Sequence, residues 1–230
     1  MKTNYEGHEG VYQKHRLQPE RVGWDDAQQL AANVVSMERV LQWPTFPKAG
    51  KVLELGCGAG NICIELAKRG FQTYGVDIAP TAIEWARQNA SLAGVAGEFS
   101  VGNVLELADF SDESFDVVLD GHCLHCIIGD DRTRFFANAR RLLRPGGTLL
   151  VRTMCNEVPK GLMLRGNFDP ETRCTISTAG YATRYFGWAN DIIREVIGAR
   201  FDVVQLMVDP AKVDVEVDLD ELLLVARKPC

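Results

Sequence analysis

Three glycines within five residues are the most informative chemical feature of this sequence. Gly56, Gly58 and Gly60 directly follow the apolar run 52–55. Glycine adopts backbone angles denied to other residues and lets a ligand approach the chain closely. Asp77 ends the next apolar run, and a carboxylate at that place can accept hydrogen bonds from both hydroxyls of a ribose. The combination predicts a site for a ribose-containing cofactor.

Structural roles without a ligand are the alternatives for the polar residues around this turn. Asp77 could cap a helix or a turn, and Asn103 could be a turn residue. Glu54, two residues before the turn, could anchor the turn through backbone N–H groups. That last role and cofactor contact do not exclude each other.

A second cluster of reactive side chains covers residues 120–126, which read DGHCLHC. His122 or His125 could accept a proton from a substrate hydroxyl, amine or thiol, because imidazole titrates near neutrality. His122 is the first choice as general base. The alternative is that these histidines only form a hydrogen-bonded wall of the cofactor pocket.

The same cluster raises the question of a metal site, since Cys123 and Cys126 have C-x-x-C spacing. So short a segment cannot direct all its side chains to one ion, and the sequence offers no second C-x-x-C or H-x-x-H pair. We therefore expect buried thiols and no metal. The seven cysteines are an odd number, which favours free thiols over a disulfide framework.

Strands that alternate with helices must position these residues. The apolar patterns predict strands at 52–55, 72–76, 98–101, 115–120 and 148–152, with helices at 61–69, 80–92 and 132–143. A helix at 191–197 then precedes two strands, 201–208 and 221–226, that no helical pattern separates. We predict a Rossmann-like, doubly wound α/β fold. Its seven-stranded sheet is mostly parallel, ends in an antiparallel hairpin, and carries helices on both faces.

The motifs at these strand ends resemble the class I S-adenosylmethionine-dependent methyltransferase family. The resemblance rests on five segments in family order: VLELGCGAG at 52–60, GVDI at 75–78, GNV at 102–104, FDVVLD at 115–120 and LLRPGG at 142–147. It implies that Glu54 and the glycines flank the methionine part of the cofactor and that Asp77 holds the ribose hydroxyls. It also implies that Ile78 and Val104 enclose the adenine. Asn103 stands where many members have Asp, beside the adenine amino group.

The expected cofactor is S-adenosylmethionine, with S-adenosylhomocysteine as product. The sulfonium carries most of the difficult chemistry, so the protein mainly aligns the reactants and excludes water, and a dedicated catalytic residue is not required. The expected cofactor-binding residues are Glu54, Gly56, Cys57, Gly58, Gly60, Asn61, Asp77, Ile78, Asn103, Val104, Asp120, Gly121 and His122.

Two segments outside the core pattern are candidates for the acceptor pocket. Residues 1–50 combine a stretch without periodicity at 5–24, interpreted as a surface arm or a substrate lid, with a helix at 25–41 and a linker at 43–50. Within the main domain, 51–230, a long irregular insertion at 153–187 follows the fifth strand, and such insertions usually cover a site. In the resembled family an arm and an insertion of this kind form the acceptor pocket. The residues expected to suit a partly apolar, anionic acceptor are Tyr5, Tyr12, Trp24, Tyr185, Trp188, Arg16 and Arg165.

Composition narrows the partners. The 230 residues carry a formal net charge of -6, which disfavours nucleic acid because phosphate binding needs clustered Lys and Arg. No apolar run approaches a membrane span and the first residues do not form a secretion signal, so we expect a cytoplasmic monomer or homodimer acting on a small molecule.

Three alternative functions stay open at this point. A nicotinamide oxidoreductase predicts a G-x-G-x-x-G turn, with which the G-x-G-x-G turn here disagrees. A cofactor-binding subunit without methyl transfer would keep the same motifs. Methylation of a protein substrate, which needs an open acceptor groove, is the third.

Overall fold

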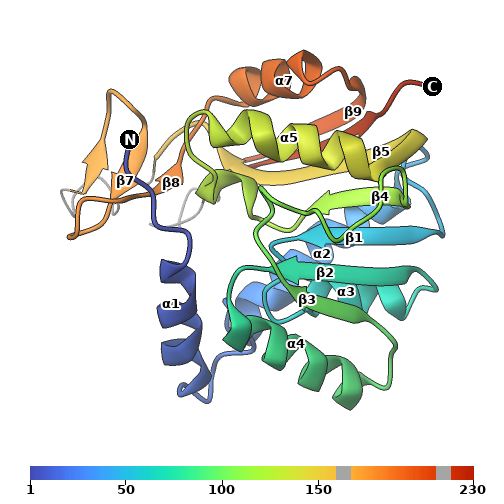
Figure 1. Ribbon diagram of the computed structural model, residues 1–230, viewed down its shortest axis with the longest axis horizontal. Coiled ribbons are helices and arrows are strands. Elements are labelled where there is room, and N and C mark those ends of the chain that lie inside the picture. The colour runs from blue at the N-terminus through green and yellow to red at the C-terminus, as the bar shows by residue number, and fades with distance from the viewer. Residues whose placement is uncertain (159–166, 211–218) are drawn as a thin grey trace.

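A computed structural model describes residues 1–158, 167–210 and 219–230. Its main sheet has seven strands in the order β3-β2-β1-β4-β5-β10-β9 (Figure 1). Strands β1 to β5 run parallel, and β10 pairs antiparallel with both β5 and β9. The predicted sheet and closing hairpin are therefore confirmed. The bounds are β1 Lys51–Leu55, β2 Gln72–Asp77, β3 Glu98–Val101, β4 Phe115–Asp120, β5 Leu143–Cys155, β9 Asp202–Asp209 and β10 Asp220–Arg227.

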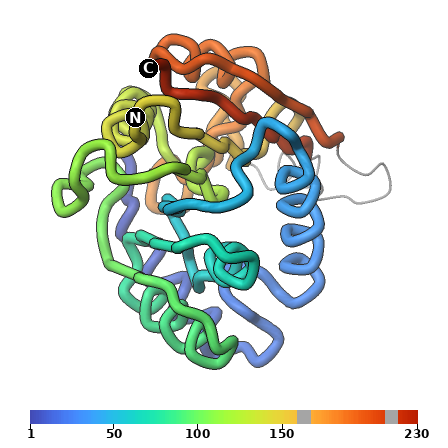
Figure 2. Tube along the Cα trace, turned by 90° about the vertical axis from the view of Figure 1, so that its right-hand side faces the viewer, coloured from blue at the N-terminus to red at the C-terminus, as the bar shows by residue number. Residues whose placement is uncertain are grey.

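Helices cover both faces of this sheet. Residues of α2 (Ala27–Gln42) and α3 (Asn61–Ala67) share one buried apolar cluster with one face of the sheet, and α4 (Pro80–Ala93) packs beside α3. The opposite face is covered by α5 (Asp131–Leu142) and α7 (Ala189–Gly198). Figure 2 shows α2 standing beside the C-terminal strands, where Arg39 pairs with Asp209 at 2.5 Å. This contact places α2 next to the end of the hairpin of β9 and β10 that carries Glu221.

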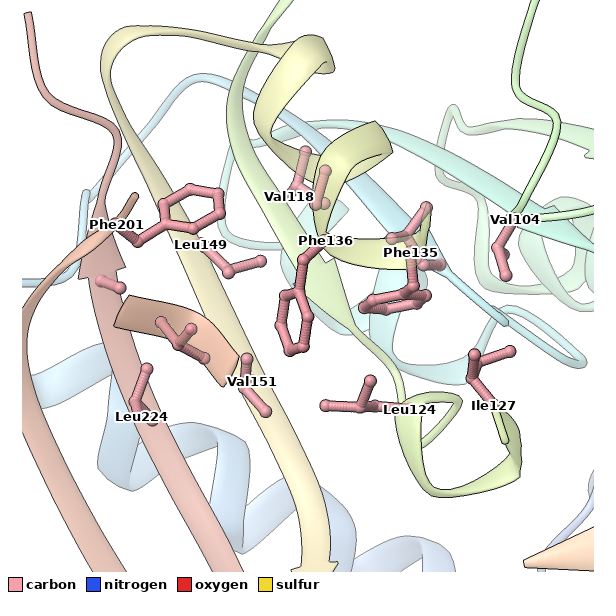
Figure 3. Packing of buried hydrophobic residues seen from close by; sticks show 14 of the residues in the cluster. Val104, Val118, Leu124, Ile127, Phe135, Phe136, Leu149, Val151, Phe201 and Leu224 are labelled. Carbon is pink, nitrogen blue, oxygen red and sulfur yellow. The ribbon is translucent and has the colours of Figure 1, made fainter. Parts of the chain in front are cut away.

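The core under α5 fixes the end of β4. Phe135 and Phe136 are almost fully buried and pack among Leu124, Leu149 and Val151 (Figure 3). Because interiors are close-packed, these contacts restrict the segment after β4. The histidine cluster is thus attached to the core through Leu124.

The N-terminal arm is more regular than its sequence indicates. Residues Gly7–Arg16 form helix α1, where a stretch without periodicity was expected. Tyr12 is the one buried residue of this helix, so the sequence has no apolar repeat that would predict the helix. Tertiary contacts hold α1: Tyr12 packs on Ala79 and Ala82, and Glu9 accepts hydrogen bonds from Thr81 at the start of α4.

The predicted irregular insertion also contains secondary structure. A three-stranded antiparallel sheet consists of β6 (Phe168–Asp169), β7 (Cys174–Ile176) and β8 (Ala182–Tyr185). Strands this short leave too few alternating positions for a sequence signal. Thr3 forms a bridge with Ala182, so the N-terminus lies beside this small sheet (Figure 1).

Helix α2 begins with a capping box, and its cap should be measurable as stability. Asp26 accepts hydrogen bonds from Gln28 N and Gln29 N, both at 2.9 Å, and Gln29 Oε1 accepts from Asp26 N. We expect Asp26→Ala to lower the free energy of unfolding by about 1 kcal/mol, because two backbone donors lose their acceptor. Urea unfolding measures this. Glu20→Ala, at an exposed site, is the matched control, and an equal loss in both variants would contradict the cap.

Candidate functional site

The glycine turn after β1 is held against the end of β2. The backbone N–H groups of Gly56 and Cys57 donate to the carbonyl of Val76 at 2.8 and 3.0 Å. Gly56 has a φ of 70°, and a Cβ there would lie 2.6 Å from the Cβ of Cys123. A side chain at this position is therefore excluded by both conformation and space.

Asp77 joins the turn to the start of α4. Its Oδ2 accepts from Gly58 N and its Oδ1 from Ala79 N, both at 2.9 Å. Burial raises the pKa of this carboxyl, while the two backbone hydrogen bonds oppose the shift. Each carboxylate oxygen has a second lone pair, so Asp77 can still accept one further donor at each oxygen.

Three residues lie at the expected adenine end: Ile78 directly after Asp77, and Asn103 and Val104 after β3. All three line one cavity with the glycine turn. The Oδ1 of Asn103 accepts from Leu105 N at 3.0 Å. Asn103 therefore does form the turn that was its structural alternative, and the second lone pair of Oδ1 and the amide N–H groups are left for a ligand.

Glu54 is a buried acid behind the turn. It is 2% exposed, and its Oε2 accepts from Cys63 N at 3.0 Å. Burial raises the pKa of Glu54 to about 7, although the Cys63 hydrogen bonds and the charge of Arg152 oppose the shift. Glu54 thus binds a backbone N–H of α3, not one of the turn as expected, and the carboxyl also lines the cavity.

The raised pKa of Glu54 predicts a pH-dependent stability difference. The folded protein binds the Glu54 proton more tightly than the unfolded chain, so this contribution is complete below pH 4.5 and is lost as pH rises through about 7. Glu54→Gln lacks this loss, so its free energy of unfolding relative to wild type should rise between pH 5 and pH 8 on the order of 2 kcal/mol. Urea unfolding of the ligand-free protein at both pH values measures the difference. Glu20→Gln should show no such change, and a pH-independent effect of Glu54→Gln would refute the assignment.

The segment after β4 is organised by Asp120. Its Oδ1 accepts from Cys123 N at 2.8 Å and from Leu124 N at 2.9 Å, and burial raises its pKa to about 6. Gly121 packs on Glu54, since a Cβ there would lie 2.5 Å from Glu54 Oε1. Asp120 thereby shapes the chain that carries both histidines.

The two histidines have different surroundings. The Nε2 of His122 lies 2.8 Å from Oε1 of Glu221 in β10. His125 belongs to a short 3-10 helix, Leu124–Cys126, and is buried, which holds its pKa well below the usual value. Their ring centroids are 6.3 Å apart. His125 is therefore neutral at physiological pH, and His122 has a carboxylate partner that the sequence did not reveal.

The cysteines of the site are free thiols. Burial raises the pKa of Cys57, Cys63, Cys123 and Cys126, so these groups are neutral and weakly nucleophilic. Within the described part of the chain, no group of three or more His, Cys, Asp or Glu side chains is placed to hold a metal ion.

One cavity of about 950 Å³ joins the turn, the histidines, the arm and the small sheet. Most of the expected cofactor residues line it: Glu54, Gly56, Cys57, Gly58, Asn61, Asp77, Ile78, Asn103, Val104, Gly121 and His122. Gly60 and Asp120 are not among the lining residues. Gly60 instead starts α3 with a φ of 75°, and Asp120 is fully buried.

Only some of the expected acceptor residues line the cavity. Tyr5, Tyr12 and Trp24 of the arm line the cavity. Tyr185 and Trp188 instead stack under Arg132 and Arg173. Arg16 lies over Trp85 outside the cavity, and Arg165 lies outside the described residues.

The charged residues of the cavity wall that went unrecognised in the sequence include Arg152, Arg184 and Glu221. Arg152 and Glu221 lie on strands that read as apolar, so a single polar residue in each was the only signal. Arg184 is on β8, which had no strand signal.

Known proteins that are similar to this chain include methyltransferases. Residues 53–151 match the family model described as a methyltransferase domain. A ubiquinone biosynthesis O-methyltransferase of Mesorhizobium japonicum is 32% identical over 114 residues, which are 50% of this chain and 44% of that protein. The chain thus matches less than half the length of this curated relative.

Solved structures share the fold. A Pyrococcus horikoshii protein has a TM-score of 0.72 at 22% identity, with 94% of this chain and 98% of that chain covered. A Burkholderia thailandensis 1,6-didemethyltoxoflavin-N1-methyltransferase with bound S-adenosylhomocysteine has a TM-score of 0.68 at 22% identity, covering 98% and 87%. Residues 53–151 thus form a methyltransferase domain, and the fold around them is similar to that of class I S-adenosylmethionine-dependent methyltransferases.

Proposed function

We propose that this chain transfers a methyl group from S-adenosylmethionine to an O, N or S atom of a small-molecule acceptor. The observation that carries the proposal is the cavity, which connects the residues of the cofactor motifs to the histidine pair. Its volume of about 950 Å³ is at the upper end of the range for ligand pockets. It offers space for an acceptor beside a cofactor.

The groups along the cavity fit the chemistry of the cofactor. Asp77 retains lone pairs for two ribose hydroxyls beside its two backbone donors. Ile78 and Val104 offer apolar surfaces for adenine, with the amide of Asn103 near its amino group. Glu54 and the turn formed by Gly56 and Gly58 then face the methionine part.

The reaction requires alignment and little else from the protein. When bound, S-adenosylmethionine supplies a methyl carbon on a sulfonium and leaves as S-adenosylhomocysteine. His122 lines the cavity and would take the proton of the acceptor, and His125 is the second candidate base. The lining of α1 and β8 residues would exclude water from the reacting atoms.

The acceptor side of the proposal rests on the arm and the insertion. Residues 1–50 would act as the acceptor lid on a catalytic domain of residues 51–230, with the insertion at 153–187 closing the pocket. Two relatives act on small molecules by name, one at oxygen and one at N1, which supports the same acceptor class here. The net charge of -6 disfavours nucleic acid. We further propose that the protein is a cytoplasmic monomer or homodimer. Among the described residues no helix has the length and apolarity to cross a bilayer.

Calorimetric titration of the purified protein with S-adenosylmethionine and, separately, with NADH tests the proposal. We expect micromolar binding of S-adenosylmethionine and none of NADH. Release of S-adenosylhomocysteine is then followed with a panel of phenols, amines and thiols. Binding of NADH alone would overturn the proposal, and cofactor binding without transfer to any probe would favour the non-catalytic alternative.

A further inference from the structure

Four elements bring polar side chains together at one end of the cavity. His122 follows β4, Glu221 is on β10, Ser36 is on α2 and Arg152 is on β5. Glu221 Oε1 lies 2.8 Å from His122 Nε2 and 3.3 Å from Arg152 Nη2, and Oε2 accepts from Ser36 Oγ at 2.7 Å. Both oxygens of Glu221 are thus held in place.

Glu221 remains a carboxylate in this setting. Burial alone would raise its pKa, but the neighbouring His122, the charge of Arg152 and the hydrogen bond of Ser36 together lower it to about 2. Arg152 is fully buried, and its Nε and Nη1, like Nε2 of His122, make no hydrogen bond of good geometry among the described residues. The nearby carboxylate therefore provides a necessary counter-charge for a buried cation.

The backbone of His122 is held in an unfavourable conformation. Its φ is 63°, a left-handed value that costs a residue other than glycine roughly 1 kcal/mol or more. Asp120 fixes the following turn through Cys123 N and Leu124 N, while Gly121 lies against Glu54. The imidazole lies against Glu221 at the cavity wall, where 32% of the His122 side chain is exposed.

We propose that Glu221 is a positioning residue whose carboxylate, 2.8 Å from Nε2 of His122, keeps the ring proton on Nε2, so that Nδ1 accepts a proton from a weakly acidic hydroxyl of the acceptor. This inference rests on the proposed methyl transfer and narrows its acceptor class to phenols and enols. As the acceptor oxygen bonds to the methyl carbon, the carbon–sulfur bond breaks and its electron pair stays on sulfur. The hydroxyl proton moves to Nδ1, and the resulting imidazolium is paired with Glu221 until it releases the proton to water.

The acceptor class follows from which acceptor groups must lose a proton before they can attack the methyl carbon. A phenol of ordinary acidity is mostly protonated near neutral pH, so its oxygen gains from proton removal. An aromatic thiol is largely ionised there and needs no base. A carboxylate beside one ring nitrogen of a histidine keeps the proton on that nitrogen, so that the other nitrogen is the base. Carboxylates have this effect on other functional histidines.

The test compares Glu221→Gln and His122→Gln with wild type, using catechol and thiophenol as methyl acceptors. Because general-base catalysis is worth roughly 100-fold or more, both variants should lose at least that factor in kcat with catechol and less than about 3-fold with thiophenol. Equal losses with both acceptors would overturn the proposal.

A measurement without turnover separates this inference from the proposed function. In wild type we expect an exchange-protected Nε2–H proton resonance of His122 in ¹⁵N-labelled protein at low temperature, absent in Glu221→Gln and retained in Ser36→Ala. If no probe is methylated, the proposed function fails while this resonance still decides the pair. If Glu221→Gln does not fold, His122→Gln decides the acceptor preference. A resonance that persists in Glu221→Gln would overturn the positioning role.

Discussion

Asp77→Ala should abolish measurable binding of S-adenosylmethionine, weakening it by a factor of about 100 or more. In the folded protein Asp77 binds Gly58 N and Ala79 N at 2.9 Å each and has lone pairs left for two ribose hydroxyls. Hydrogen bonds to a charged group are each worth about 1.5–3 kcal/mol, and two of them correspond to at least this factor. Calorimetric titration measures the loss.

Two further variants separate contact from collapse of the turn. Asp77→Asn keeps one oxygen acceptor in the same volume, so it should bind more weakly than wild type and more tightly than Asp77→Ala. Glu171→Ala, at an exposed site away from the cavity, should bind like wild type. If Asp77→Ala bound within threefold of wild type, the ribose assignment would be wrong.

Arg132→Ala should cost about 3 kcal/mol in the free energy of unfolding. The side chain is 6% exposed and pairs with both oxygens of Glu195, at 2.8 and 2.6 Å. Its Nη1 donates to the carbonyls of Leu124 and Ile127. Removal takes the side-chain donor from the Ile127 carbonyl and leaves Glu195 without its partner, while the Leu124 carbonyl keeps the N–H of Ile127. Breaking such buried pairs costs about 3–5 kcal/mol.

Urea unfolding measures this loss, and the midpoint of thermal unfolding should fall by roughly 6–12 °C. Arg134→Ala is the matched control, because its pair with Asp131 is 55% exposed on the arginine side and exposed pairs contribute about 0–1 kcal/mol. A loss below 1 kcal/mol in Arg132→Ala would show that the segment of Leu124 and His125 is held by other contacts.

Much of the fold was predictable because its signals are local. Each parallel strand is a short apolar run and each helix has its own apolar face, so the mostly parallel sheet followed from general rules on βα units. The order of the strands came only from the structure. Helix α1 and the strands β6 to β8 escaped because tertiary contacts stabilise them. Tyr12 of α1 is buried by residues distant in the sequence, among them Ala79 and Ala82 at the start of α4.

The cofactor side of the candidate site was equally accessible from sequence. Gly56 and Gly58 lie in the turn after β1 and Asp77 is the last residue of β2, and the carboxyl ends of neighbouring parallel strands meet at one edge. Their proximity therefore follows from topology alone. Asn103 shows the limit of this reasoning, since its use of Oδ1 in a local turn depends on the actual backbone.

The sequence by itself determined the family resemblance, the cofactor turn and the choice of His122, since all three depend on residue types at strand ends. Only the tertiary structure placed Glu221 beside His122 and Ser36 beside Glu221, the latter across 185 positions of sequence. The physical reason is that the antiparallel register of β10 on β5, which pairs Glu221 with Met154, and the packing of α2 on the sheet bring distant residues together. Such contacts leave no periodic pattern in the residues that make them.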